Sequence, residues 1–360
     1  MSNRLHEERV ATARRLLARG GVIPAHPLAL DADRRLDERR QRAISRYYLD
    51  AGADGLAVGV HTTQFGIRAA GLFPDVLRIS AEAAREHADR EPVLVAGVIG
   101  DTAQAIAESE LALSHGYHAV LLNVAAWRDA NEDDILAHCA AVAEVAPVIG
   151  FALLPEVGGF HLSYDFWRRF AAIPSVVAIK MAPFNRYRTL DIVRAVVAAG
   201  AEERITLYTG NDDHIVLDLL APFDVAHDGE LVRVRVAGGL LGHWSVWTHA
   251  AVAQFDTIRR AVRAGAVPPD LLALDSRVTD ANAAIYDAQH DFAGCIPGCL
   301  EVLRRQGFVE GTWCLDPDET LSPGQLDAID RVWREHPDLA DDDFVAAHIS
   351  RWLDTPGGSQ

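Results

Sequence analysis

Eight short apolar segments recur along the first two thirds of the chain, and they restrict the possible folds more than any other feature. Each segment is apolar throughout rather than alternating, as in parallel strands that are covered on both faces. Successive segments start roughly 30 residues apart, which is the spacing of βα units in a closed eight-stranded barrel. The predicted strands are residues 22–25, 55–60, 93–98, 119–123, 148–153, 176–179, 205–209 and 239–244.

The segments between these strands carry helix signals. A helix predicted over 37–51 starts at Asp37, a good N-cap residue, and stops before Gly52. Similar helices are predicted at 102–115, 131–145, 163–172 and 190–199. Alternating strands and helices fit either a barrel or a doubly wound sheet, but no Gly-x-Gly-x-x-Gly follows the first strand. We therefore predict an α/β fold of the (β/α)8 TIM-barrel type.

Two regions depart from the repeating pattern. Asp228-Gly229 lies between two strand-like runs and predicts a hairpin insertion near 222–237. After about residue 265 the strands stop, and helices are predicted at 271–290, 298–306, 323–335 and 341–352. We expect residues 1–265 to form the barrel with an N-terminal helix, and residues 266–360 to form a C-terminal helical extension packed on it.

Composition limits the partners and the compartment. The chain has 34 Lys and Arg against 51 Asp and Glu, a net charge of −17 that repels nucleic acid and anionic lipid. Four cysteines are too few for a disulfide scaffold; Cys295 and Cys299, four apart, are expected to pack as thiols, with a metal or redox site as the alternative. Residues 1–19 lack the apolar core of a secretory signal, and no apolar run is long enough to cross a membrane. We expect a cytoplasmic protein with no nucleic-acid or membrane partner.

Catalytic groups of such barrels lie at the C-terminal ends of the strands. Lys180 ends one apolar run in an Arg-rich chain. In a desolvated barrel mouth its pKa would fall, and the neutral amine would attack a carbonyl carbon to form an iminium. The alternative is a lysine that reaches solvent or pairs with a carboxylate.

Other polar groups stand at predicted strand ends. The hydroxyls of Thr62 and Thr63 would hold a substrate carboxylate, or else cap a loop. His61 titrates near neutrality, although a lone histidine is more often structural. A metal site is the rival arrangement, with no local ligand signature to support it; its five candidate ligands are His26, His61, Asn123, Asp212 and His243.

The seventh and eighth strand ends add further candidates. Gly210 would let a ligand approach the backbone, whereas Asn211 and Asp212 would bind substrate or simply cap the next helix. His243 would face either the pocket or the helices outside the barrel.

Several segments resemble the dihydrodipicolinate synthase and N-acetylneuraminate lyase family of class I aldolases. The similar segments are Gly21-Val-Ile-Pro-Ala-His-Pro-Leu, Ala51-Gly-Ala-Asp-Gly-Leu-Ala-Val-Gly59, Val95-Ala-Gly-Val-Ile-Gly-Asp-Thr102, Val177-Ala-Ile-Lys180 and Gly239-Leu-Leu-Gly-His-Trp-Ser245. The resemblance spans about residues 20–335. It implies a barrel, Lys180 as the Schiff-base lysine, no cofactor, and a homo-oligomer, either a tetramer or a dimer.

The chain would be a divergent member, because family motifs are altered. The family's Gly-Thr-Thr-Gly-Glu becomes His61-Thr-Thr-Gln-Phe65, and its Tyr-Asn-x-Pro becomes Phe151-Ala-Leu-Leu-Pro155. A second family tyrosine is replaced near Trp127, and the arginine of the synthases falls near Val157. We therefore do not expect dihydrodipicolinate synthesis itself. The replacement acid/base candidates are, in order, His61, Tyr208, His243 and Tyr187.

The leading hypothesis is a Schiff-base lyase, aldolase or dehydratase that acts on a pyruvate-type or sugar-derived 2-oxo acid. Lys180, His61 and Tyr208 would be catalytic, and Thr62, Thr63, Gly210, Asn211 and His243 would bind substrate. The alternatives are a catalytically inactive homologue that binds an oxo acid, and a metal-dependent barrel enzyme.

Overall fold

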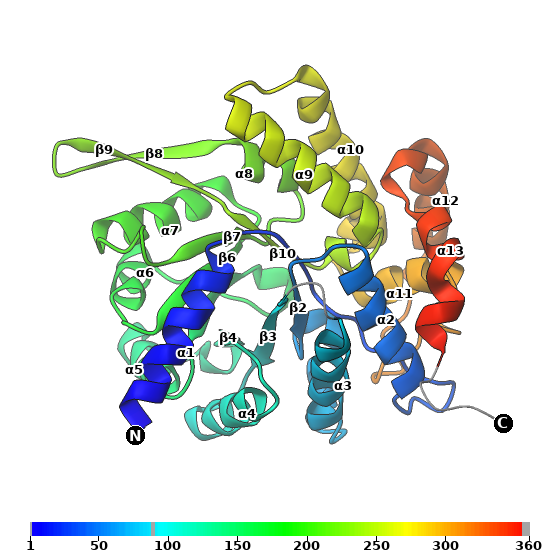
Figure 1. Cartoon of the computed structure of the whole chain (residues 1–360), viewed down its shortest axis with the longest axis horizontal. Coiled ribbons are helices and arrows are strands. Elements are labelled where there is room, and N and C mark those ends of the chain that lie inside the picture. Colours follow the sequence, from blue (N-terminus) through cyan, green and yellow to red (C-terminus); the bar gives the residue numbers. More distant parts are fainter. Residues whose placement is uncertain (1, 88–90, 355–360) are drawn as a thin grey trace.

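The computed structural model describes residues 2–87 and 91–354. Eight parallel strands form one sheet in the order β1-β10-β7-β6-β5-β4-β3-β2, and a parallel bridge between Ala25 and Ala57 joins its two edges. The predicted (β/α)8 barrel is thus confirmed (Figure 1). The strands are β1 (Val22–Pro24), β2 (Gly55–Val58), β3 (Val93–Val98), β4 (Ala119–Leu122), β5 (Val148–Leu153), β6 (Val176–Ala182), β7 (Thr206–Thr209) and β10 (Gly238–Leu241).

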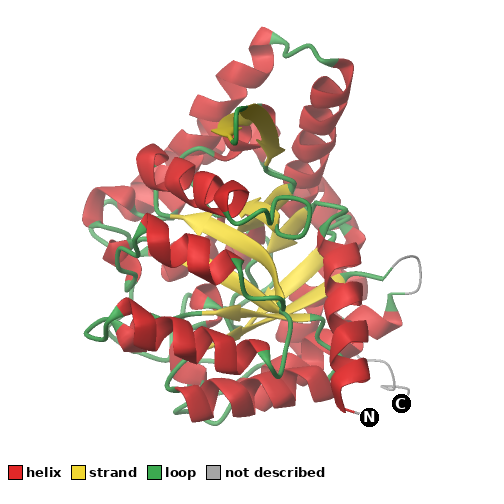
Figure 2. Cartoon of the chain, turned by 90° about the vertical axis from the view of Figure 1, so that its left-hand side faces the viewer, coloured by secondary structure: helices red, strands yellow, loops and turns green. Residues whose placement is uncertain are grey.

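Helices surround the barrel (Figure 2). They are α2 (Glu38–Asp50), α3 (Phe73–Glu86), α4 (Thr102–Ser114), α5 (Glu132–Ala143), α6 (Tyr164–Ala171), α7 (Arg186–Ala198), α8 (Ile215–Leu220) and α9 (Thr248–Ala264). The capping signals in the sequence operate as expected: Asp37 and Asn131 each accept a hydrogen bond from the backbone N–H three residues on. Helix α7 starts at Arg186, earlier than predicted, because Asn185 caps it.

The N-terminal helix α1 (Ser2–Leu17) covers the N-terminal end of the barrel. Its apolar residues Val10, Ala13, Leu16 and Leu17 belong to the same buried cluster as side chains that face the barrel interior. One end of the barrel is therefore filled, and the C-terminal strand ends remain for a functional site.

The predicted hairpin is present. β8 (Pro222–His227) and β9 (Glu230–Arg235) pair antiparallel, and Asp228 and Gly229 form the two-residue turn with φ of 50° and 84°. Positive φ at both central residues suits the twist of a hairpin, which is why an Asp-Gly pair marks the position. The hairpin projects beside α7 (Figure 1).

The C-terminal region is helical and packs against the barrel helices. Its helices are α10 (Pro269–Ile285), α11 (Cys295–Arg305), α12 (Gln325–Glu335) and α13 (Asp342–Leu353). Trp352 of α13 lies 5.3 Å from Tyr47 of α2 between ring centroids, and one hydrophobic cluster runs through both layers. The separation into domains at residue 265 stays a prediction. Helix α10 ends at Ile285, short of the expected residue 290, and the chain then turns toward the barrel mouth.

In the described parts of the chain, no helix combines the length and the apolarity needed to cross a membrane.

Candidate active site

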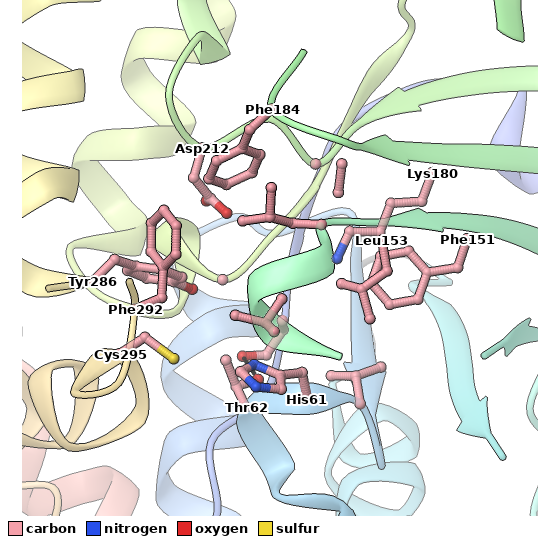
Figure 3. Close-up of a pocket in the computed structure, with 17 residues that line it drawn as sticks. His61, Thr62, Phe151, Leu153, Lys180, Phe184, Asp212, Tyr286, Phe292 and Cys295 are labelled. Carbon is pink, nitrogen blue, oxygen red and sulfur yellow. Dashed lines mark hydrogen bonds between the residues drawn. The ribbon is translucent and has the colours of Figure 1, made fainter. Parts of the chain in front are cut away.

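A cavity opens at the C-terminal ends of the strands, between the barrel and the C-terminal helices (Figure 3). Its volume is about 560 Å³, counting the space at its open mouth. Strands β1, β2, β5, β6, β7 and β10 or the loops after them supply most of the lining, and the segment from the end of α10 to the start of α11 supplies the rest. The lining residues are Ala25, Val60, His61, Thr62, Phe151, Leu153, Leu154, Val157, Lys180, Ala182, Phe184, Gly210, Asp212, Gly242, Tyr286, Phe292 and Cys295.

Lys180 lies inside β6, because this strand runs on to Ala182 rather than stopping at residue 179. Its side chain is buried, and its Nζ lies 4.4 Å from the ring centroid of Phe151, the neighbour on β5. Within residues 2–87 and 91–354, no carboxylate forms an ion pair with it. Burial lowers the pKa of Lys180 below 10.5, and the negative charge of Asp212 partly offsets this. Lys180 is also the only lysine in the sequence.

Asp212 faces the cavity from the loop after β7 (Figure 3). Its Oδ1 accepts a hydrogen bond from the backbone N–H of His243 at 3.1 Å. Burial raises the pKa of Asp212, and the nearby charge of Lys180 lowers it. Asp212 does not cap a helix, since α8 starts only at Ile215. The sequence left Asp212 open as a substrate-binding residue, a helix cap or a metal ligand, and its position at a strand end was the signal for a cavity residue.

His61 and Thr62 form the opposite wall (Figure 3). Burial, and then the charge of Lys180, lower the pKa of His61 to about 4, so its ring is neutral at pH 7. Neither ring nitrogen has a hydrogen-bond partner among the described residues. The hydroxyl of Thr62 donates to Ala25 O at 2.8 Å, and that of Thr63 donates to His26 O at 2.6 Å.

Thr63 is a loop-forming residue in this structure. Its Oγ1 also accepts the backbone N–H of Gly59 at 3.0 Å, and its side chain does not line the cavity. By contrast, the backbone N–H groups of His61 and Thr62 have no backbone hydrogen-bond partner within the described chain, and both residues line the cavity.

Gly210 and Asn211, which also follow β7, are packed against neighbouring groups of the chain. Gly210 lines the cavity, and a methyl group there would lie 2.5 Å from Lys180 Cε, so the glycine accommodates the lysine stem. Asn211 points elsewhere: its amide donates to Asp218 Oδ2 at 2.9 Å, and its Oδ1 accepts the N–H of Phe184 at 3.0 Å. It holds the β6 and β7 loops together.

Three predicted acid/base candidates lie outside the cavity. The Tyr208 hydroxyl donates to Leu17 O of α1 at 2.8 Å, toward the closed end of the barrel. Tyr187 is 84% exposed on α7. His243 is buried with Nδ1 3.4 Å from the Asn282 amide of α10, and its backbone N–H donates to Asp212, which lines the cavity. Their positions do not support an acid/base role for these three side chains in the cavity.

The C-terminal region contributes Tyr286, Phe292 and Cys295 to the cavity (Figure 3). The strand-end rule misses them, because it considers only barrel loops. Cys295 was expected only to pack in the interior. Its thiol is buried, but it also faces the cavity. The sequence offers no local signal for this placement.

Two of the three residues that replace the family's motif residues line the cavity, and one lies outside it. Phe151 presents a phenyl ring to Lys180, and it lies in the segment that replaces the Tyr-Asn-x-Pro motif of the family that the sequence resembles. Trp127 stacks on His138 and donates its Nε1–H to Gly100 O at 3.1 Å, outside the cavity. Val157 lines the cavity with an apolar side chain.

Among the described residues, no group of three or more His, Cys, Asp or Glu side chains is arranged to hold a metal ion. His26, one of the five proposed ligands, is held instead by Ser45 Oγ at 2.8 Å and by the Pro27 carbonyl at 2.8 Å. The site geometry gives the metal-dependent alternative no support.

Comparison with family models matches residues 18–223 to the dihydrodipicolinate synthetase family. A 4-hydroxy-tetrahydrodipicolinate synthase of Listeria monocytogenes serotype 4a is 28% identical over 208 residues, 56% of this chain and 64% of that protein. An N-acetylneuraminate lyase of Citrobacter koseri is 26% identical over 209 residues, 57% of this chain and 66% of that protein. The chain thus spans about three fifths of the length of the curated relatives it matches.

Solved structures extend the likeness in fold. The chloride-inhibited dihydrodipicolinate synthase of Acinetobacter baumannii, complexed with pyruvate, matches with a TM-score of 0.71 at 17% identity, covering 89% of this chain and 98% of that chain. An N-acetylneuraminate lyase of Fusobacterium nucleatum matches with a TM-score of 0.69 at 16% identity, covering 88% and 99%. At these identities the likeness shows the fold alone.

Proposed function

Because this chain belongs to the dihydrodipicolinate synthetase family, we propose that it is a class I aldolase-type lyase that forms a Schiff base between Lys180 and a 2-oxo acid such as pyruvate. One observation carries the proposal: a buried amine without an ion-pair partner, as far as the chain is described, faces a cavity at the strand ends. A cavity beside a lysine whose ammonium form is disfavoured by burial is the arrangement that imine chemistry requires.

The first step needs the neutral amine. Nζ attacks the C2 carbonyl carbon, its lone pair forms the C–N bond, and the carbonyl oxygen takes up a proton. The proton taken up by the oxygen is the one released by the nitrogen, which gives a neutral carbinolamine. A second proton, supplied by water at the open mouth of the cavity, lets the hydroxyl leave as water and gives an iminium. Burial of Lys180 supports this step, because desolvation disfavours the ammonium form.

The substrate carboxylate would lie against His61 and Thr62. Their backbone N–H groups have no backbone hydrogen bond to break, whereas the Thr62 hydroxyl already donates to Ala25 O. Backbone donors therefore carry carboxylate binding in this proposal, and the side chains of Thr62 and Thr63 keep the loop in position.

The iminium then accepts the electron pair of a bond to C3. Cleavage of C3–C4 releases an aldehyde, and removal of a C3 proton gives the same enamine. We assign the proton transfers to His61, whose ring is neutral and lines the cavity. Dehydration of a substituted 2-oxo acid uses the same enamine, so an aldolase and a dehydratase remain two forms of the proposal.

The proposal does not extend to dihydrodipicolinate synthesis. Phe151 has no hydroxyl to relay a proton, and Val157 offers no cation for a second carboxylate. These same losses favour the inactive oxo-acid-binding homologue as the second candidate.

Borohydride trapping tests the proposal and separates the two candidates. The protein is incubated with pyruvate, reduced, and mapped by peptide mass, with Lys180→Arg as the control. Because Lys180 is the only lysine, the α-amino group at the N-terminus is the other amine that could react. We expect an adduct on Lys180 alone; its absence at saturating pyruvate would overturn the Schiff-base mechanism.

Deuterium uptake at C3 of pyruvate in D₂O then reports whether the imine proceeds to an enamine. Exchange supports a lyase. A trapped imine without exchange would favour the inactive homologue.

We also propose that the protein is a cytoplasmic homo-oligomer, either a tetramer or a dimer. Exposed apolar side chains on neighbouring helices support an association surface: Tyr164 of α6 is 37% exposed, and Tyr187 and Leu190 of α7 are 84% and 40% exposed. Sedimentation analysis tests this, and a monomer at micromolar concentration would contradict it.

A further inference from the structure

Tyr286 follows α10 and turns its ring into the barrel mouth (Figure 3). Its backbone N–H donates to Asn282 O at 2.7 Å, which continues the helix by one residue, and its side chain is only 7% exposed. The phenol enters from the C-terminal helices, whereas Lys180 enters from β6 (Figure 3). The two groups thus approach the cavity from different sides.

Gly242, just after β10, makes room for this phenol. A methyl group on Gly242 would lie 1.4 Å from the Tyr286 hydroxyl oxygen. The φ of Gly242 is −68°, which any residue adopts, so the space and not the backbone conformation requires a glycine. The Tyr286 hydroxyl is therefore packed closely against the barrel.

The Tyr286 hydroxyl is buried without a hydrogen-bond partner in the described part of the chain. The Cys299 thiol interacts weakly with this hydroxyl, because a thiol is a poor hydrogen-bonding group, and the contact does not meet hydrogen-bond geometry. Burial raises the pKa of Tyr286 well above 10, so the group keeps its proton and is a donor. Buried hydroxyls without a partner are rare, and one that lines a cavity can be satisfied by a bound ligand.

The surrounding wall is apolar. Phe184 and Phe292 meet edge to face with ring centroids 5.5 Å apart, and Leu154 and Val157 lie alongside. Both phenylalanines have left-handed backbone conformations, with φ of 46° and 68°. Such conformations are unfavourable for side chains of this size and collect where a ligand is bound.

The charges in the cavity exclude a second anion. No arginine lines the cavity in the described chain, and the positive charge of the Lys180 iminium would already be opposed by the carboxylate next to C2 of the same substrate. A carboxylate or phosphate on the rest of the substrate would meet the buried Asp212 without a compensating cation. A polyhydroxylated chain would likewise find few polar partners on the apolar wall.

We propose that the end of the cavity formed by Tyr286, Phe184 and Phe292 selects 2-oxo acids with an uncharged, mainly apolar tail that bears one oxygen bound by Tyr286 Oη. Tyr286 donates a hydrogen bond to that hydroxyl or carbonyl oxygen. The inference rests on the proposed function, because the Lys180 imine positions the tail. It makes the C-terminal helices part of substrate recognition.

The test measures the concentration of each 2-oxo acid that half-saturates borohydride trapping on Lys180. The probes are pyruvate, 2-oxohexanoate, 2-oxoadipate, and 2-oxohexanoates hydroxylated at carbon 4, 5 or 6. We expect 2-oxohexanoate to half-saturate at a concentration at least about tenfold lower than 2-oxoadipate, and one hydroxylated acid to improve on 2-oxohexanoate by about tenfold.

Tyr286→Phe should remove the advantage of the hydroxylated acid over 2-oxohexanoate. Tyr208→Phe, which alters a buried tyrosine outside the cavity, is the matched control and should change none of these values. Asp212→Asn should reduce the discrimination against 2-oxoadipate.

The outcomes separate the two proposals. If pyruvate itself is not trapped, the proposed function fails and this inference fails with it. If pyruvate is trapped but 2-oxohexanoate is excluded, or 2-oxoadipate is preferred, or Tyr286→Phe leaves the selectivity unchanged, only the inference about the tail is overturned.

Discussion

The Nζ atom of Lys180 lies over the face of the Phe151 ring, 4.4 Å from its centroid, and the two residues are paired across β5 and β6. A ring face attracts an ammonium ion, but it offers neither a proton acceptor nor a counter-charge. Desolvation is therefore the largest influence on the protonation of the amine, and it disfavours the ammonium form. The reactivity we assign to Lys180 and its cost in stability have this same origin.

Lys180→Met should stabilise the protein at low pH. Burial lowers the pKa of Lys180 in the folded chain below 10.5, so the folded chain binds this proton less tightly than the unfolded chain. The loss of folding stability caused by burying the charged lysine is present in full below the folded-state pKa, and it disappears as the pH rises toward 10.5. We expect a gain of about 1–2 kcal/mol in unfolding free energy at pH 6, and little gain near pH 10, by urea denaturation.

Lys180→Arg is the matched control, because a guanidinium keeps its charge throughout this range. It should show no gain at either pH. A Lys180→Met protein that is less stable than the wild type at pH 6 would contradict the assignment of a desolvated amine.

His61→Ala should abolish most proton transfer while leaving the imine intact. The ring of His61 is neutral above its pKa of about 4, so it can accept a proton at pH 7. We expect the rate of deuterium exchange into pyruvate C3 to fall by about 10² or more, by proton NMR. Borohydride trapping on Lys180 should persist. Unchanged exchange would remove His61 from the mechanism.

Gly210→Ala should slow imine formation without unfolding the chain. The added methyl group would lie 2.5 Å from Lys180 Cε and 2.8 Å from Ala182 Cβ, so the lysine stem has to move. We expect the rate of pyruvate trapping to fall at least about tenfold, since misplaced reacting groups lose rate steeply. Gly66→Ala, whose methyl would meet only the Leu315 side chain at 3.4 Å, is the control and should react normally.

Tyr208→Phe should affect stability and not chemistry. The hydroxyl donates to Leu17 O at 2.8 Å, and its removal leaves that buried carbonyl without this bond. We expect a loss of about 1–2 kcal/mol in unfolding free energy, with pyruvate exchange within about twofold of the wild type. A large loss of pyruvate exchange at unchanged stability would instead indicate that Tyr208 takes part in catalysis.

The barrel could be predicted because its evidence is local. Apolar strands, the caps at Asp37 and Asn131, and the Asp228-Gly229 turn each depend on neighbouring residues, and the structure contains all of them. Lys180 could be selected for a related reason, since parallel strands bring their C-terminal ends together in every barrel.

Tyr208 shows where that rule stops. It is paired with Lys180 across β6 and β7, and nothing in the strand distinguishes the two. Inside the barrel a long side chain can lean toward either end. Packing of α1 directs the Tyr208 hydroxyl to Leu17, while Lys180 turns to the open mouth.

The sequence by itself determined the barrel, the hairpin, the helical extension and the position of one lysine, because these follow from short-range periodicity and turn chemistry. Tertiary structure alone decided which polar groups share the cavity. Tyr286 enters because α10 stops at Ile285 and Gly242 leaves room for the phenol. Asn211 stays outside because Asp218 and Phe184 occupy its amide. Such convergence depends on how distant segments pack, and no local pattern encodes that packing.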